Sequence, residues 1–210
     1  MARLLARSEI SRWTLWLAVF APLTVVYLLT VRINPADMSA DPAAVTPSAW
    51  QIAHFGTPRL PSSVQPFSYH NDWLIPSGSG QVVSNREPGL VLLAVPFYWV
   101  MSSAGVGNVL PAGIAAALCS SAAMATLALV ARRLVPAKTA VAVGLLAGVA
   151  TTTWSVSGTS LWPHGPDQLY LAVSMEALAL GASGYAGLAF AGAILTRPPL
   201  AIVAAVTGVW

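Results

Sequence analysis

The sequence predicts an all-α protein, a polytopic transmembrane helix bundle with a large first extracytoplasmic loop. Three observations predict this class. Of the 210 residues, 56% are hydrophobic and only 8% are charged, whereas a soluble domain is about 25% charged. Long uncharged runs recur along the chain at lengths that suit a bilayer. A single membrane orientation places most of the lysines and arginines on the cytoplasmic side, as the positive-inside bias requires.

The composition also excludes several other classes of protein. Seven acidic and ten basic residues cannot cover the surface of a soluble chain of this length. The single cysteine, Cys119, cannot form an internal disulfide. A net charge of +3 is too small and too scattered to indicate nucleic-acid binding. No P-loop, GxGxxG or HExxH pattern occurs, so the sequence does not support a nucleotide-binding or zinc-protease function.

Residues 13–31 form the first predicted span, nineteen residues without a charge. Arg3, Arg7 and Arg12 precede it, which predicts a cytoplasmic N-terminus. A cleaved signal peptide is the alternative. The apolar run exceeds the usual signal core of about 7–15 residues, and no clear A-x-A site follows, which favours an uncleaved anchor.

Residues 32–109 form the predicted outer loop. Its polar part, residues 32–88, holds eight prolines and four of the seven acidic residues, and a segment of this length predicts an ordered loop with a function. Within it, residues 47–55 predict a short interfacial helix and residues 77–80 a flexible tip.

Residues 89–103 are apolar but too short for a typical span, and Pro96 interrupts them. If they crossed the membrane, Arg132, Arg133 and Lys138 would lie outside, against the positive-inside bias. If they lie in the outer interface, those three bases join the N-terminal arginines inside. The charge distribution therefore predicts an interfacial helix at residues 89–103.

The remaining predicted spans cover residues 110–131, 139–158, 169–182 and 185–210. Small residues around Cys119 suit close helix packing in the first of these. Arg197-Pro198-Pro199 breaks the last, because proline removes helix donors. The chain stops within this apolar run, so we expect a fragment of a longer protein. This topology brings the loop acids, the Arg86-Glu87 pair and residues 162–167 to the same outer side.

Asp41, ten residues beyond the first span, is the candidate catalytic residue. A carboxylate held at a partly dry membrane surface can act as a general base toward a hydroxyl. The alternative is a solvated loop aspartate, and Asp37 is a competitor four residues away.

Arg86 is the candidate phosphate-binding residue, next to Glu87. A guanidinium at the headgroup level can pair bidentately with a phosphate. The alternative is an interface anchor that reaches the lipid headgroups.

His164 and Asp167 lie at the predicted outer mouth of two spans. Metal ligation is one interpretation, but two ligands do not make a site; a helix start capped by Asp167 is the other. Glu176 lies deep in its predicted span, where an acid is costly. Either Arg197 is its partner or it is a protonated, structurally tolerated glutamate.

These features together resemble the amino-terminal part of the GT-C membrane glycosyltransferases, of the protein-mannosyltransferase and lipid A aminoarabinose-transferase type (glycosyltransferase family 39-like). The family's outer loop opens with an essential aspartate, and Asp41 followed by residues 52–61 is similar to that stretch. Arg86-Glu87-Pro88-Gly89 is similar to the family's basic-proline motif, although its arginine stands two positions before the proline. Residues 193–198 resemble the family's LTK/LTRP segment.

The resemblance implies sugar transfer from a polyprenyl-phosphate-linked donor to a glycan, lipid or protein acceptor at the outer face of the plasma (inner) membrane. It implies that Asp41 deprotonates the acceptor. Arg86 and Arg197 would hold the phosphate, and Glu87, His164 and Asp167 would complete the substrate site. No cofactor is assigned, and a divalent-metal requirement stays open. The alternative is a non-catalytic membrane protein, a transporter or scaffold fragment. A transporter predicts paired internal repeats, and the sequence has none.

Overall fold

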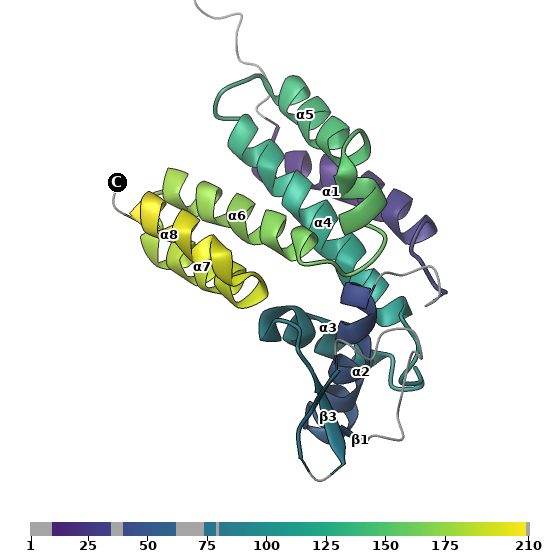
Figure 1. Cartoon of the computed structure of the whole chain (residues 1–210). Helices are drawn as coiled ribbons and strands as arrows, with labels where there is room; N and C mark the ends of the chain where they lie inside the picture. The colour runs from purple at the N-terminus through teal and green to yellow at the C-terminus, as the bar shows by residue number, and fades with distance from the viewer. Residues whose placement is uncertain (1–9, 35–39, 62–73, 79, 209–210) are drawn as a thin grey trace, which may run out of the picture.

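The computed structural model describes residues 10–34, 40–61, 74–78 and 80–208 (Figure 1). Helices dominate these residues, which confirms the all-α prediction, and one small antiparallel sheet is added to them. Among the described residues, two helices are long and apolar enough to cross a membrane by length and composition, α1 (Arg12–Leu29) and α4 (Leu110–Ala131). The bounds of α4 are those that the apolar pattern predicts.

Helix α4 is the centre of the bundle and packs against α1, α5 (Ala137–Val149) and α6 (His164–Ala179). It is mostly alanine and serine on its packing faces, and Ala115, Ala116 and Ala117 are fully buried. Such short side chains let neighbouring backbones approach closely. The role predicted for the small residues of this helix is therefore confirmed.

Helix α1 meets α5 through equally close contacts. A Cβ atom added at Gly148 would lie 2.6 Å from Leu23. The Tyr27 hydroxyl donates to the Gly148 carbonyl oxygen at 2.9 Å. The end of α1 is therefore held beside the end of α5.

The predicted helix over residues 139–158 is wrong in its second half. Helix α5 ends at Val149, and a short π-helix, η3 (Thr153–Ser157), follows. The Thr151 hydroxyl donates to the Ala147 carbonyl oxygen at 2.6 Å and accepts from the Thr153 backbone N–H at 3.1 Å. Threonine side chains that bond the backbone in this way compete with the regular helix.

The predicted span over residues 169–182 also shifts, since α6 begins at His164 and ends at Ala179. Gly165 and Pro166 fall in the first turn, where backbone N–H groups have no partner within the helix, so a proline costs nothing there. Gly165 also allows close packing, because an added Cβ would lie 2.8 Å from the Ser120 hydroxyl on α4.

The last predicted span, residues 185–210, is broken at Arg197-Pro198-Pro199 as predicted, and its described residues form two helices. Helix α7 (Ser183–Thr196) ends where Arg197 adopts an extended conformation before Pro198, as a residue before proline prefers. A 3-10 turn, η4 (Pro198–Leu200), leads into α8 (Ala201–Gly208). Figure 1 shows α8 turning back along α7.

The outer-loop segment lies at one end of the bundle (Figure 1). Helix α2 (Ala40–Phe55) begins before the predicted residue 47, and it packs on α3 (Pro88–Val100), which also contacts α4 and α7. The sheet has the order β1-β3-β2 and is antiparallel throughout. Its strands are β1 (Leu60–Pro61), β2 (Leu74–Pro76) and β3 (Gln81–Ser84).

The segment predicted as a flexible tip, residues 77–80, falls between β2 and β3, and its residue 79 lies outside the described residues. The Gln81 N–H donates to the Gly78 carbonyl oxygen at 3.0 Å. Gly78 and Gly80 have φ angles of 69° and 71°, a conformation that glycine adopts without steric cost.

Candidate functional site

Three helix ends meet where α3 begins, α6 begins and α7 ends. Gly89, in the first turn of α3, touches the last turn of α7 so closely that an added Cβ would lie 2.6 Å from the Leu195 backbone carbon. Glycine is therefore required by this approach. The contact brings the Arg86-Glu87 pair beside Thr196 and Arg197, which are far away in the sequence.

Asp167 is the buried centre of this meeting point. It lies in the first turn of α6 and is only 5% exposed. The Thr196 hydroxyl donates to its Oδ1 at 2.6 Å, and Thr196 is itself fully buried. Asp167 Oδ2 is buried and has no hydrogen-bond partner among the residues that the structure describes. One face of the carboxylate is therefore fixed and the other has an unused acceptor.

Arg197 places a positive charge next to that unused acceptor. Its Nη1 lies 4.0 Å from Asp167 Oδ2 and 3.2 Å from His164 Nδ1. The arginine side chain is 47% exposed, so it reaches from solvent toward the buried carboxylate. The extended backbone at Arg197 turns the chain at this point, before the two prolines.

Glu87 supplies a second carboxylate. It occupies the N-cap position of α3, but its side chain makes no capping hydrogen bond. Its Oε2 is buried and has no hydrogen-bond partner within the described part of the chain. We call Glu87, His164, Asp167, Thr196 and Arg197 the Asp167 cluster. Arg86 directly precedes it in the chain.

Several groups of the Asp167 cluster act on the pKa of Asp167, in opposite directions. Burial raises the pKa of its carboxyl above the usual range. The hydrogen bond from Thr196 and the charges of Arg197 and His164 oppose that rise, whereas the nearby charge of Glu87 adds to it. A cationic or hydrogen-bond-donating ligand at Oδ2 would lower the pKa again.

The structure therefore brings together four of the residues predicted as substrate-binding, Glu87, His164, Asp167 and Arg197, and Arg86 directly precedes Glu87 in the chain. The predicted catalytic residue, Asp41, is the second residue of α2, and its side chain lies outside the described part of the structure. Its competitor Asp37 falls wholly outside the described residues. The helix that carries Asp41 does pack on α3, whose first turn carries Gly89.

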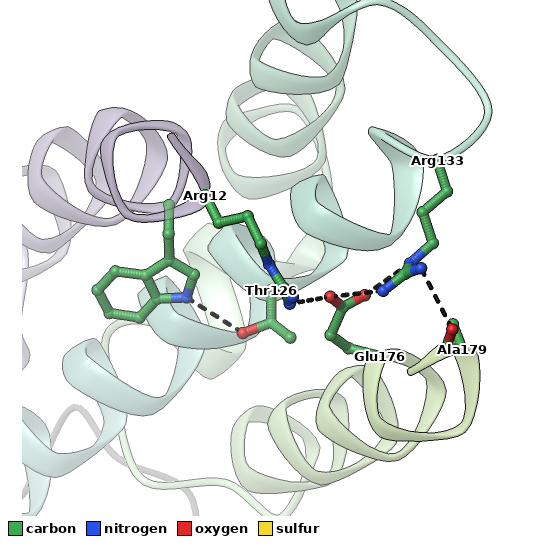
Figure 2. Close-up of polar contacts among 6 residues, drawn as sticks. Arg12, Thr126, Arg133, Glu176 and Ala179 are labelled. Carbon is green, nitrogen blue, oxygen red and sulfur yellow. Dashed lines mark hydrogen bonds and ion pairs between the residues drawn. The ribbon is translucent and has the colours of Figure 1, made fainter. Parts of the chain in front are cut away.

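Glu176 has different partners from the one predicted. Arg197 does not pair with it; instead the carboxylate is held between Arg12 and Arg133 (Figure 2). Arg133 donates from Nε to Oε2 at 3.1 Å and from Nη2 to Oε1 at 3.0 Å, and its Nη1 donates to the Ala179 carbonyl oxygen at 3.2 Å. Because Glu176 lies near the end of α6, it is near the arginines that begin α1 and follow α4.

Sequence reasoning missed one feature of the site and one pairing at the other end of α6. Thr196 orients Asp167. In the sequence, the only indication of this role was the position of Thr196 directly before Arg197-Pro198, within residues 193–198. The partners of Glu176 had a clearer signal. The orientation that puts Arg12 and Arg133 on the inner side also puts the inner end of the span carrying Glu176 beside them.

The chemistry of the Asp167 cluster suits a ligand that carries both hydroxyls and negative charge. Buried carboxylate oxygens without partners are acceptors for ligand hydroxyls, since buried polar groups rarely stay unbonded. Guanidinium groups bind phosphate or carboxylate. Among the described residues, no group of three His, Cys, Asp or Glu side chains could hold a metal ion.

Comparison with known proteins adds no relative. No protein-family model, no curated protein and no solved structure matches this chain.

Proposed function

We propose that this chain is the membrane-embedded part of a glycosyltransferase that uses a polyprenyl-phosphate sugar donor. In this proposal the Asp167 cluster and Arg86 bind the donor at the outer face of the membrane. The single observation that carries the proposal is that a hydrogen-bond acceptor, Asp167 Oδ2, and a cation, the Arg197 guanidinium, lie next to each other. A buried acceptor oxygen without a partner in the described residues lies 4.0 Å from a half-exposed guanidinium.

A sugar phosphate satisfies both groups at once. A sugar hydroxyl can donate to Asp167 Oδ2 and another to Glu87 Oε2, which offsets the cost of burying those oxygens. The phosphate can bind Arg197 and Arg86, where a guanidinium offers a planar fork of donors. As the glycosidic bond breaks, the same arginines stabilise the negative charge that develops on the leaving phosphate.

The acceptor half of the reaction is assigned to Asp41. A carboxylate at this position would accept the proton of the acceptor hydroxyl as that oxygen attacks the sugar. This role comes from the resemblance to the GT-C glycosyltransferases, and the packing of α2 on α3 is compatible with it.

The proposal includes a multi-pass location, with the N-terminus in the cytoplasm. Large apolar side chains are exposed along the helices, including Leu29 at 81%, Leu146 at 61%, Leu188 at 71% and Ile202 at 71%. A water-soluble monomer seldom exposes this many large apolar side chains. A bilayer around α1, α5, α7 and α8 would cover it. The two longest apolar helices, α1 and α4, support the same location.

The test is donor binding, because it does not require the acceptor to be known. Purified protein in lipid nanodiscs is titrated with a panel of labelled polyprenyl-phosphate sugars. We expect at least one to bind, and unlabelled polyprenyl phosphate to compete more weakly than the matching sugar conjugate because it lacks the hydroxyls for Asp167 and Glu87. If no conjugate binds better than polyprenyl phosphate, the proposal fails and a non-catalytic membrane protein, a transporter or scaffold fragment, becomes the better interpretation.

A further inference from the structure

The opposite end of the bundle carries a second cluster of charges that the proposed reaction does not use. Arg12, Arg132, Arg133 and Glu176 line a cavity of about 290 Å³ together with apolar side chains. Three guanidinium groups against one carboxylate leave an excess of two positive charges. We call these four residues the Glu176 cluster.

We propose that the Glu176 cluster binds the phosphate of an anionic membrane phospholipid, and that the lipid's acyl chain lies in the adjoining apolar groove. The site is distinct from the Asp167 cluster, which lies at the other end of α6. The inference needs the helices to be in a bilayer, but it does not depend on sugar transfer.

The ion pairs of Glu176 prepare the cavity for an anion. They hold Arg12 and Arg133 at opposite sides of one buried carboxylate (Figure 2). The two arginine side chains stay 56% and 36% exposed, so they can still donate toward the cavity. A guanidinium that is already oriented loses less freedom when it binds a phosphate.

Arg132 adds a charge that is independent of those ion pairs. It lines the same cavity, and its described hydrogen bond goes to the Val135 carbonyl oxygen at 3.4 Å rather than to Glu176. Its positive charge is therefore not neutralised by a described carboxylate, and a bound phosphate would neutralise it.

A second cavity supplies the apolar part of the site. It has a volume of about 610 Å³ and is lined by Arg12, Trp13, Trp16 and Leu129. Two of these residues, Arg12 and Leu129, also line the first cavity. The Trp16 side chain is held in place by donating to the Thr126 hydroxyl at 3.2 Å and by stacking on Phe20. A cationic cavity that continues into an apolar groove matches a molecule with an anionic head and a hydrocarbon tail.

The expected orientation of the chain points to the same ligand. The positive-inside bias places this end at the cytoplasmic leaflet, where anionic lipids are concentrated and where basic pockets between helices bind their headgroups. A free phosphate ester would satisfy the arginines but would leave the apolar groove without a function.

The test compares probes that differ only in the headgroup or the tail. Detergent-solubilised protein is titrated by calorimetry with dioctanoyl-phosphatidylglycerol, dioctanoyl-phosphatidylcholine and glycerol 3-phosphate. We expect the first to bind in preference to the other two. Comparable binding of phosphatidylcholine would overturn the role of the charge, and comparable binding of glycerol 3-phosphate would overturn the role of the acyl chain.

Two variants and one matched control locate the site. Arg132→Gln should weaken phosphatidylglycerol binding by about tenfold, as expected for one charge-assisted contact at a partly exposed site, and should leave the Glu176 ion pairs intact. Lys138→Gln is the matched control, because Lys138 is an exposed base at the same end that lines neither cavity. Leu129→Trp, which changes no charge, should also weaken binding by filling the junction. Equal losses in the two charge variants, or no loss in Arg132→Gln, would overturn the proposal.

Discussion

Asp167 is the residue on which the candidate site depends, because it is buried, bonded on one side and open on the other. Its hydrogen bond with Thr196 fixes the carboxylate, and the charge of Arg197 partly offsets the cost of burying it. A buried carboxylate oxygen without a hydrogen bond lowers the stability of the fold, but the same oxygen can accept a hydrogen bond from a ligand. Asp167 is therefore a residue at which stability and binding make opposite demands.

The pH dependence of stability tests this description of Asp167. Burial raises the pKa of Asp167 in the folded protein. Its contribution to the free energy of unfolding is therefore most favourable below the pKa of the unfolded chain, about 3.9, and is lost as the pH rises through the folded pKa. Asp167→Asn cannot ionise. We expect the melting temperature of the variant, relative to the native protein, to rise between about pH 4 and pH 8. Thermal unfolding in detergent measures it, and a constant difference across this range would contradict the assignment.

Arg86 tests the phosphate contact. If it binds the donor phosphate, Arg86→Ala should weaken donor binding by about 1.5–3 kcal/mol, the range for hydrogen bonds to charged groups. Arg86→Lys should restore only part of the loss, because lysine lacks the bidentate fork. Arg59→Ala is the matched control, since Arg59 is an exposed arginine of the same outer loop. Unchanged donor affinity in Arg86→Ala would leave Arg86 as an interface anchor.

Asp41 tests the proposed base. Positioned proton transfer contributes about 10²–10⁴-fold to rate, so Asp41→Asn should reduce turnover by about that factor in membranes that contain the protein. Donor affinity should change little, because the carboxylate acts on the acceptor. Asp37→Asn is the control and should have a smaller effect. If Asp37→Asn abolished transfer while Asp41→Asn did not, the wrong carboxylate would have been chosen.

At the residue scale, sequence reasoning predicted which polar residues share a side but not how they pair. Charge and topology placed Arg86, Glu87, His164 and Asp167 together, and the structure brings them to one meeting point of helices. For Glu176 the sequence left open a pair with Arg197 or a protonated glutamate without a partner, and the structure shows neither, since Arg12 and Arg133 hold it. Pairings between distant segments depend on helix packing, which hydropathy does not encode.

At the scale of the helices, the apolar runs predicted that a helix exists more accurately than they predicted where it begins and ends. The run at residues 110–131 has no internal conflict, and its helix has the predicted bounds. The run at residues 139–158 is equally apolar, but hydrogen bonds from Thr151 end α5 early. The run at residues 185–210 contains a turn because of Arg197 and its prolines. The break at Arg197 and its prolines was predicted from the sequence, whereas the early end of α5 was not, because a hydropathy window does not register the hydrogen bonds of a single threonine.

Gly89 tests whether the meeting of α3 and α7 builds the site. In Gly89→Ala the new methyl group would overlap the Leu195 backbone, and such overpacking costs about 1–3 kcal/mol. We expect a lower melting temperature and weaker donor binding, because α3 carries Arg86 and Glu87 away from Arg197. Gly105→Ala is the control, since an added Cβ there meets nothing within 4 Å. Equal effects of the two variants would show that the contact does not position the site.

At the scale of the whole molecule, α6 joins two charged clusters of different kinds. Its first turn holds Asp167, and its last turns hold Glu176, about 13 Å further along at 1.5 Å per residue. The first cluster has carboxylate oxygens open to a ligand, and the second has an excess of arginine. If the helices cross a bilayer, this division assigns a substrate site to the outer face and an anchor for anionic lipid to the inner face.

The sidedness of the two ends is the central claim of this account, and cysteine accessibility in intact cells tests it most directly. In a Cys119→Ala background, single cysteines replace the exposed residues Leu134, Ile75 and Thr152. A membrane-impermeant thiol reagent should label Ile75→Cys and Thr152→Cys in intact cells, and should label Leu134→Cys only after the membrane is opened. Labelling of Leu134→Cys in intact cells, with protection of Thr152→Cys, would contradict the orientation and remove the donor site from the outer face.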